Sequence, residues 1–320
     1  MIRVSEAVLP GHPDKFCDQV ADAIVAESYR VDPRAYCQVE VSVWSDQVWI
    51  SGGVATREPF ERPLDDIVRE VGQKIGYVGG NAIDAERYQV TDTVCRFVRD
   101  PREWTNHVND QAVVIGWAGY DEKTDYLSPE HFLSDRLRGV LFDSCREGAL
   151  AGQGPDGKLL VRIRENPDAW HLESVVVSLQ HLPDLDVVEL VARVGRVVHA
   201  SYEALQASDA RWVADWDEIE VLINPNGPLI VGGSNGDNGQ TGRKLVMDYY
   251  GPRVPIGGGA LFGKDLAHID RAGAYEARRV ALDVVKGGAS ECKVVASYAP
   301  NLDGPLDVSF EIEGGGRPPA

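Results

Sequence analysis

Apolar residues recur along the chain at two spacings, which together predict a mixture of helices and strands. Phe16, Val20 and Ile24 follow one another at helical spacing. They predict an amphipathic helix that begins near Pro13, because proline is favoured in the first helical turn. Further stripes of helical period predict helices at 64–75, 130–142, 186–205 and 275–285.

Strict alternation predicts a strand at 38–44, because Val39, Val41 and Val43 share one face while polar side chains share the other. The stretch 47–51 is expected to be its hairpin partner, with a turn between them. Other short apolar or alternating runs predict strands at 111–118, 159–164, 174–179, 218–223 and 293–297.

The order of these elements favours an α+β architecture. Helices and strands are mixed without the strict alternation of a doubly wound sheet. The stretches 145–157 and 206–216 are interpreted as connections, and the end of the chain, GGGRPPA at 314–320, is expected to be disordered.

Composition narrows the classes of partner. The 320 residues carry a formal net charge of −18, which disfavours nucleic acid, because its binders normally show a basic face. The five scattered cysteines lack C-x-x-C spacing, so they predict neither a zinc site nor a disulfide framework. No signal peptide and no bilayer-spanning apolar run is visible. We therefore expect a cytoplasmic protein with no membrane partner.

The segment 11–15, GHPDK, opens the first predicted helix and is the first candidate for chemistry. A helix N-terminus offers free amide donors and the positive end of a dipole, which suit phosphate. His12 and Lys15 add donors, and Asp14 offers oxygen to Mg²⁺. An ordinary helix boundary with a turn histidine is the alternative interpretation of this segment alone.

Three further segments combine glycines with charged residues. The triplet DGK at 156–158 is, on its own, more typical of a hairpin turn. The segment 232–244 would let backbone amides approach a ligand closely, and its Arg243-Lys244 pair weighs against a flexible surface loop. It is not a Walker A loop, because Gly-Lys-Ser/Thr is absent. The segment 257–265 again places glycines before a lysine and an acid.

Taken in order, these segments resemble the methionine adenosyltransferases, also called S-adenosylmethionine synthetases. The matching strings are SEAVLPGHPDK at 5–15, DQAVVIGWA at 110–118, DGK at 156–158, SLQH at 178–181, INPNG at 223–227, GDNGQTGRK at 236–244 and GGGALFGKDLAHIDR at 257–271. The resemblance implies three similar sheet-and-helix lobes in a pseudo-threefold arrangement. We assign them to 1–100, 101–215 and 216–320, with segments interleaved.

The resemblance also implies a reaction, in which the sulfur of methionine attacks C5′ of ATP and the triphosphate leaves, to be hydrolysed to pyrophosphate and phosphate. A leaving group that gains charge needs clustered donors in a site closed to water. The implied catalytic residues are His12, Lys158, Arg243 and Lys264. The implied ATP-binding residues are His12, Lys15, Asp156, Lys158, Asp237, Arg243, Lys244, Ala260 and Lys264. Asp14 and Asp270 would hold Mg²⁺, and Glu40 would hold K⁺.

Departures from the family gather where the acceptor is expected to bind. The implied acceptor residues are Val54, Phe97, Asp110, Asp237 and His268. Of these, Val54, Phe97 and His268 stand where the family has Glu, Gln and Lys, and neither valine nor phenylalanine offers a partner to an ammonium group. The gating loop near 98–109 also looks short, and the chain ends several dozen residues before a typical member.

Three functions stay open for this short, divergent member. Methionine is the acceptor and is bound by other groups, or a different small nucleophile receives the adenosyl group, or the chain is a weakly active, ATP-binding regulatory subunit. The retained phosphate-binding positions argue against the third. Active sites of the family lie between two subunits, so we expect a homodimer or a dimer of dimers.

Overall fold

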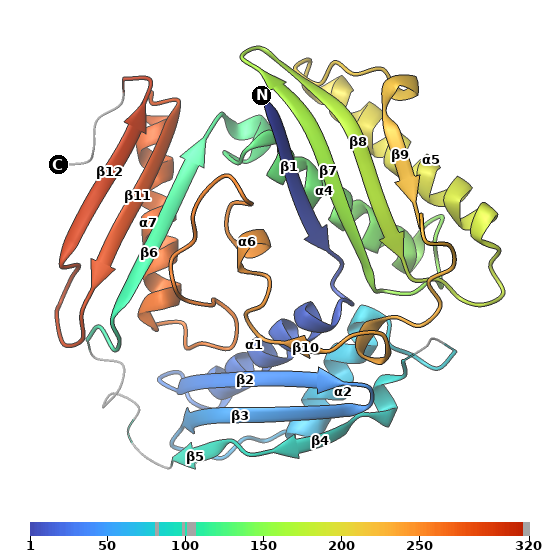
Figure 1. Ribbon diagram of the computed structural model, residues 1–320. Helices are drawn as coiled ribbons and strands as arrows, with labels where there is room; N and C mark the ends of the chain where they lie inside the picture. Colours follow the sequence, from blue (N-terminus) through green and yellow to red (C-terminus); the bar gives the residue numbers. More distant parts are fainter. Residues whose placement is uncertain (81–82, 98–99, 101–106, 316–320) are drawn as a thin grey trace.

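The computed structural model describes residues 1–80, 83–97, 100 and 107–315. They form three units, each a sheet with helices on one face, and the units lie along the sides of a triangle (Figure 1). The short helix α6 (Leu245–Asp248) and the loops around it lie between the units. The α+β class with three sheet-and-helix lobes is therefore confirmed, whereas a threefold relation among them stays a prediction.

The lower unit in Figure 1 is built on a hairpin of β2 (Tyr36–Trp44) and β3 (Gln47–Ala55), as the alternation predicted. β10 (Gly239–Gln240) pairs antiparallel with β2. β4 (Gln89–Asp92) and β5 (Cys95–Phe97) both run parallel to β3. The unit thus joins residues near the start of the chain to a segment some two hundred positions later.

Two helices cover the buried face of this sheet, α1 (Pro13–Val31) and α2 (Leu64–Ile75). His12 caps α1, because its Nδ1 accepts the amide of Asp14 at 3.2 Å, and Pro13 occupies the first helical position as expected. The apolar stripe of α1 packs against the valines of β2 in one core.

The right-hand unit holds four strands in the order β1-β7-β8-β9. They are β1 (Ile2–Val8), β7 (Gly157–Asn166), β8 (Ala169–Leu179) and β9 (Glu220–Ile223). Its helices are α4 (Pro129–Glu147) and α5 (Val187–Ser208). The hydropathy pattern did not predict β1, because Ile2 and Val4 face outward while Ser5 faces the core, where its hydroxyl hydrogen-bonds that of Ser134 at 2.9 Å.

The left-hand unit is an antiparallel sheet of order β12-β11-β6, covered by one helix. The elements are β6 (Ala112–Gly119), β11 (Glu291–Tyr298), β12 (Asp307–Glu313) and α7 (Ile269–Lys286). Gly116 lets α7 approach closely, because a Cβ there would lie 2.0 Å from the carbonyl carbon of Ala277. Four 3-10 helices complete the described elements: Ala85–Arg87, Glu122–Thr124, Trp216–Glu218 and Gly233–Asn235.

The sheets draw on distant parts of the chain, since β1 pairs with β7 and β10 pairs with β2. The division near residues 100 and 215 stays a prediction. Among the described residues, no helix is long and apolar enough to cross a membrane. Most of the short gating loop at 98–109 and of the disordered end expected at 314–320 lies outside the described residues.

An arginine whose side chain is 11% exposed links the central loops to the right-hand unit. Arg253 pairs with both carboxylate oxygens of Glu130 on α4 at 3.0 Å and with Glu165 on β7 at 2.8 Å, and it also donates to the Tyr120 hydroxyl. Such a network fixes the loop between α6 and α7 against two separate elements.

Replacing Gly116 by alanine tests the close packing of α7 on β6. The new methyl group would collide with the helix backbone, and overpacking of this kind costs about 1–3 kcal/mol. We expect a lower urea midpoint with an unchanged m value. Gly139→Ala is the matched control, because no atom lies within 4 Å of the added Cβ and alanine favours the helix. Equal midpoints for the two variants would contradict the packing.

Candidate active site

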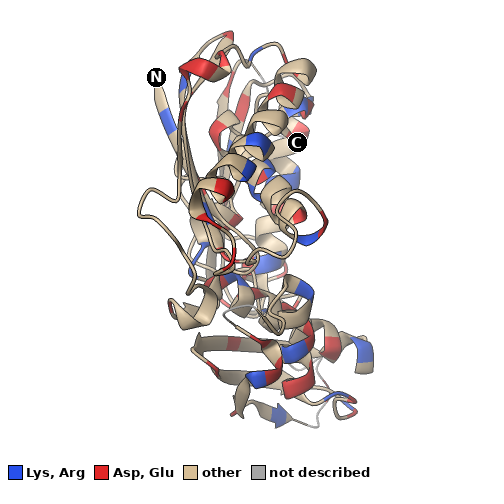
Figure 2. Ribbon diagram, turned by 90° about the vertical axis from the view of Figure 1, so that its right-hand side faces the viewer, with Lys and Arg blue, Asp and Glu red and all other residues tan. Residues whose placement is uncertain are grey.

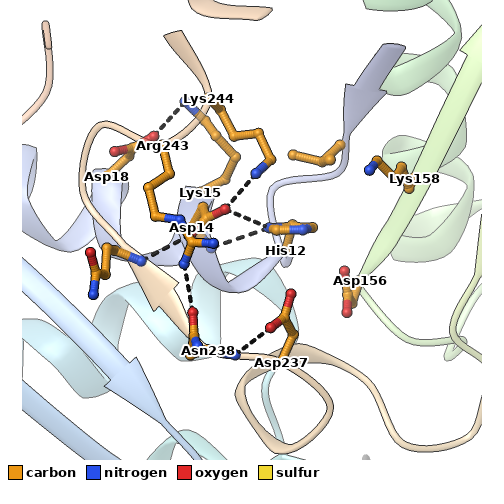
Figure 3. A network of polar contacts seen from close by, with 12 residues as sticks. His12, Asp14, Lys15, Asp18, Asp156, Lys158, Asp237, Asn238, Arg243 and Lys244 are labelled. Carbon is orange, nitrogen blue, oxygen red and sulfur yellow. Dashed lines mark hydrogen bonds and ion pairs between the residues drawn. The ribbon is translucent and has the colours of Figure 1, made fainter.

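The first cluster of charged residues surrounds the N-terminus of α1 (Figure 3). Asp14 is buried, and its carboxylate accepts the amide of Gln240 at 2.9 Å and a hydrogen bond from Lys244 Nζ. Arg243 lies 3.5 Å from Asp14 Oδ1 and donates to the side chain of Asn238. The glycine-rich segment therefore folds back on α1 and places two cations beside the amides of the helix N-terminus.

His12 is a neutral hydrogen-bond donor in this cluster. Burial, followed by the charge of Lys244, lowers its pKa to about 4. Nδ1 accepts the amide of Asp14, so the ring hydrogen is on Nε2. At neutral pH, His12 can donate to an oxygen without bringing a charge.

Two further residues join the cluster on the far side of His12 in Figure 3: Lys158 on β7, and Asp156, which directly precedes that strand. Lys158 is half exposed, and its Nζ lies 3.4 Å from Glu6 Oε2. Asp156 accepts the amide of Gly233 at 2.6 Å, and burial raises its pKa to about 6. Asp237 is exposed and raises the pKa of Asp156 further.

Lys15 already has carboxylate partners in the interior of the cluster. Its Nζ lies 2.9 Å from Asp18 Oδ2 and 2.7 Å from Asp248 Oδ1, and 3.9 Å from the centre of the Phe262 ring. Only 7% of the residue is exposed. These contacts favour an internal ion pair, and the contact with ATP expected for Lys15 stays a prediction.

The second cluster lies at the N-terminus of α7. Lys264 donates to Asp270 Oδ2, and His268 caps the helix by accepting the amide of Asp270 at 3.2 Å. Asp110 lies 4.0 Å from the other ring nitrogen of His268. Burial lowers the pKa of His268, as does Lys264. Burial raises the pKa of Glu40 on β2, while the nearby Lys264 lowers it.

The two clusters share a local design and touch each other. Each has a histidine cap, an aspartate two residues later, and a lysine on that aspartate: His12, Asp14 and Lys244 in one, and His268, Asp270 and Lys264 in the other. Their loops meet at Gly242, where an added Cβ would lie 2.8 Å from that of Ala260.

The expected acceptor residues are not all brought together. Val54 is 2% exposed and packs in the core between β3 and the helices, away from the open face of the sheet. Phe97 is 45% exposed, and its ring lies 3.6 Å from where a Cβ of Gly53 would be. Gly53 pairs with Gln38, whose backbone bridges to Lys264. The structure thus brings Phe97, but not the side chain of Val54, toward the second cluster.

Sequence reasoning missed Asp18, Asp22 and Asp248. Asp22 accepts the amide of Gly263 at 2.9 Å and pairs with Arg271 at 2.8 Å. For Asp18 and Asp22 the signal was present, because with Asp14 they stand four residues apart on α1 and share one helix face.

The donor chemistry of the two clusters fits magnesium. Among the described residues, no group of three or more His, Cys, Asp or Glu side chains could hold a metal by itself. Magnesium needs only one or two carboxylates, since phosphate and water supply its other ligands. Asp14 and Asp270 each offer a carboxylate. Each of these carboxylates already pairs with the ammonium group of a lysine, so its surroundings favour a cation.

Comparison with known proteins agrees with this geometry. The N-terminal domain of S-adenosylmethionine synthetase matches residues 1–96, and its C-terminal domain matches residues 231–318. An S-adenosylmethionine synthase of Staphylococcus epidermidis is 32% identical over 327 aligned positions, which cover 96% of this chain and 79% of that protein. One from Bifidobacterium adolescentis is 34% identical, covering 97% and 81%. The chain belongs to the S-adenosylmethionine synthetase family.

Proposed function

We propose that this protein is an ATP-dependent adenosyltransferase that converts ATP, L-methionine and water to S-adenosylmethionine, pyrophosphate and phosphate. The observation that supports this most strongly is the convergence of cations on two adjoining helix N-termini in a protein of net charge −18. Those cations are Lys158, Arg243, Lys244 and Lys264. Amide donors and cations together form a site suited to a polyphosphate.

In the first step the methionine sulfur attacks C5′ and the C5′–O bond breaks. The electron pair goes to the departing oxygen, so the triphosphate gains negative charge. His12 would donate from Nε2 to this oxygen chain, while Lys158 and Lys244 would bind phosphate oxygens. Donors aimed at developing charge are worth about 3–4 kcal/mol each.

In the second step water attacks the terminal phosphorus, and a P–O–P bond breaks to give pyrophosphate and phosphate. Arg243 and Lys264 would hold the end of the triphosphate. Both cations now contact aspartates. Binding would therefore exchange a carboxylate partner for a phosphate partner, so that each cation keeps an anionic partner.

Asp14 and Asp270 would hold Mg²⁺, and Glu40, on the polar face of β2, would hold K⁺. Bound magnesium would neutralise charge on the phosphate oxygens. The carboxylates of this chain orient the loops that carry Lys244 and Lys264. They would also supply the oxygen ligands of the metal ions.

We further propose that the site is shared in a homodimer, or in a dimer of dimers. The sheets lie toward one side of the molecule and the helices toward the other (Figure 2). Large apolar side chains are exposed on the open faces of β1, β7, β2 and β3: Ile2, Val4, Leu160, Trp44 and Trp49. A second copy on this side would cover them and bring its own second cluster toward the first.

One observation favours a different acceptor. The exposed ring of Phe97 offers an apolar surface beside Gly53, whose strand partner Gln38 bridges to Lys264. His268 is buried, with Nδ1 used in the cap of α7. Such surroundings would suit a small thioether without a free ammonium group. Methionine remains the leading acceptor, because Asp110 and Asp237 could pair with its ammonium.

A weakly active, ATP-binding regulatory subunit is the third candidate. It would bind ATP but release triphosphate or its hydrolysis products only slowly. Release of phosphate and pyrophosphate in step with a sulfonium product, at the rate of an ordinary synthetase, would exclude it.

Changing Lys264 to alanine tests the triphosphate clamp. Loss of one such donor should lower kcat about 100- to 1000-fold. The assay is phosphate release from ATP and methionine. Lys293→Ala is the control, because Lys293 pairs with Glu311 on the sheet of β11 and β12, outside both clusters. Lys264→Ala with activity within a factor of two of wild type would remove Lys264 from the site.

The acceptor is tested by kcat/KM for methionine against its des-amino and decarboxylated analogues. If Phe97 replaces a hydrogen-bonding group, Phe97→Gln should raise kcat/KM for methionine about tenfold. Val54→Glu is a poor alternative, because it would bury a carboxylate in the core. Efficient use of methionine by the wild type, with rejection of both analogues, would contradict an altered acceptor.

The pKa of Asp156 makes a prediction about pH. Because burial raises it from 3.8 to about 6, the folded state holds this proton more tightly than the unfolded state, and wild type loses stability as pH rises from about 4 to 6. Asp156→Asn removes the titration and keeps an acceptor for Gly233. The Tm of Asp156→Asn minus the Tm of wild type should be about 3 °C larger at pH 7 than at pH 4. A Tm difference that does not change with pH would contradict the raised pKa.

A further inference from the structure

Three aspartates stand four residues apart on α1, at Asp14, Asp18 and Asp22. This spacing places them on one face of the helix. Each carboxylate accepts a backbone amide from one of the two glycine-rich segments, 239–244 or 257–265. The donors, in the same order, are the amides of Gln240, Gly242 and Gly263, each at 2.9 Å.

Each of the three aspartates also pairs with a basic side chain. Lys244 pairs with Asp14, Lys15 with Asp18, and Arg271 with Asp22. These bases lie on or beside α6, α1 and α7, so the same helix face is tied to α6 and α7. We call Asp14, Asp18 and Asp22 the aspartate ladder.

Glycines allow the loops to reach the ladder. A Cβ on Gly239 would lie 2.3 Å from the carbonyl group of Pro13, and one on Gly263 would lie 2.3 Å from the carbonyl oxygen of Val39. Gly263 also has φ +75°, which side chains disfavour. The backbone therefore approaches α1 at Pro13 and β2 at Val39 more closely than other residues would permit.

The ladder sets a distance between the two cation clusters. Asp14 and Asp22 are eight residues apart, so they are separated by about 12 Å along the helix axis. Lys264 follows directly after the residue held by Asp22, and Lys244 pairs with Asp14 itself. The rigid helix α1 therefore fixes the distance between Lys244 and Lys264, although both lysines lie in glycine-rich segments.

We propose that Asp18 and Asp22 are positioning residues for adenosyl transfer. With Asp14, they hold both glycine-rich segments along α1 and so fix the spacing of Lys244 and Lys264. This rests on the proposed function, because a triphosphate is the ligand that the two lysines would span. Lys15 is then the counter-ion of Asp18 and Asp248.

The matched control is Asp32, at the C-terminal end of the same helix. It is fully buried, accepts the amides of Arg34 and Arg57 at 3.0 Å, and pairs with the Arg57 guanidinium at 2.7 Å. These contacts are of the same kind as those of Asp22, but they involve no glycine-rich segment. Asp32→Ala should therefore lower Tm without changing the spacing of the clusters.

The experiment compares Asp18→Ala, Asp22→Ala and Asp32→Ala with wild type. The readouts are kcat and KM for ATP, and hydrogen exchange of the segments 239–244 and 257–265. We expect the two ladder variants to lose about 10- to 100-fold in kcat. Asp18→Ala should speed exchange in 239–244, and Asp22→Ala in 257–265. Asp32→Ala should stay within about twofold of wild type in kcat.

The proposal is overturned if kcat falls equally in all three variants, or if the ladder variants keep wild-type kcat and exchange. Should an alanine variant fail to fold, Asp18→Asn and Asp22→Asn replace it. They keep the amide acceptor and remove the charge, so kcat should fall less while exchange stays slow. If the wild type formed no sulfonium product from ATP, the proposed function would be refuted. Hydrogen exchange of the two segments would still show whether Asp18 and Asp22 hold them in place.

Discussion

The lysines beside the N-termini of α1 and α7 are each paired with a carboxylate, and the construction of the site follows from this pairing. Lys244 contacts Asp14, Lys15 contacts Asp18, and Lys264 contacts Asp270. Burying a cation without a charged partner costs free energy of folding. The positions of the aspartates therefore determine where the loops that carry the lysines can lie. The same pairs also keep the cations close to where phosphate would bind.

The paired cations come from segments that lie far apart in the sequence. Strand β7 carries Lys158, the loop after β10 carries Lys244, and the loop before α7 carries Lys264. These segments meet because their sheets pack around α1 and the central loops. Arg253 fixes those loops from the other side through Glu130 and Glu165.

Much of the fold could be predicted because most elements have one apolar face. Strand β1 was not predicted, because its apolar residues Ile2 and Val4 point outward. Strand β10 was not predicted, because a strand of two residues shows no alternation. In the site, Val54 has the same parity as the core residues Val48 and Ile50, so alternation already placed it inside. The aspartate ladder could not be predicted, because the sequence pattern does not show which distant backbone amides will donate hydrogen bonds to the side chains of one helix face.

If these cations serve a departing triphosphate, the bond that breaks in ATP is the one between C5′ and oxygen. The direct measurement uses ATP labelled with ¹⁸O at the bridging 5′ position, incubated with wild-type enzyme and methionine, followed by mass spectrometry of all products. We expect the label in inorganic phosphate or pyrophosphate and none in the nucleoside product. Label retained on the nucleoside would show cleavage between oxygen and phosphorus and would contradict adenosyl transfer.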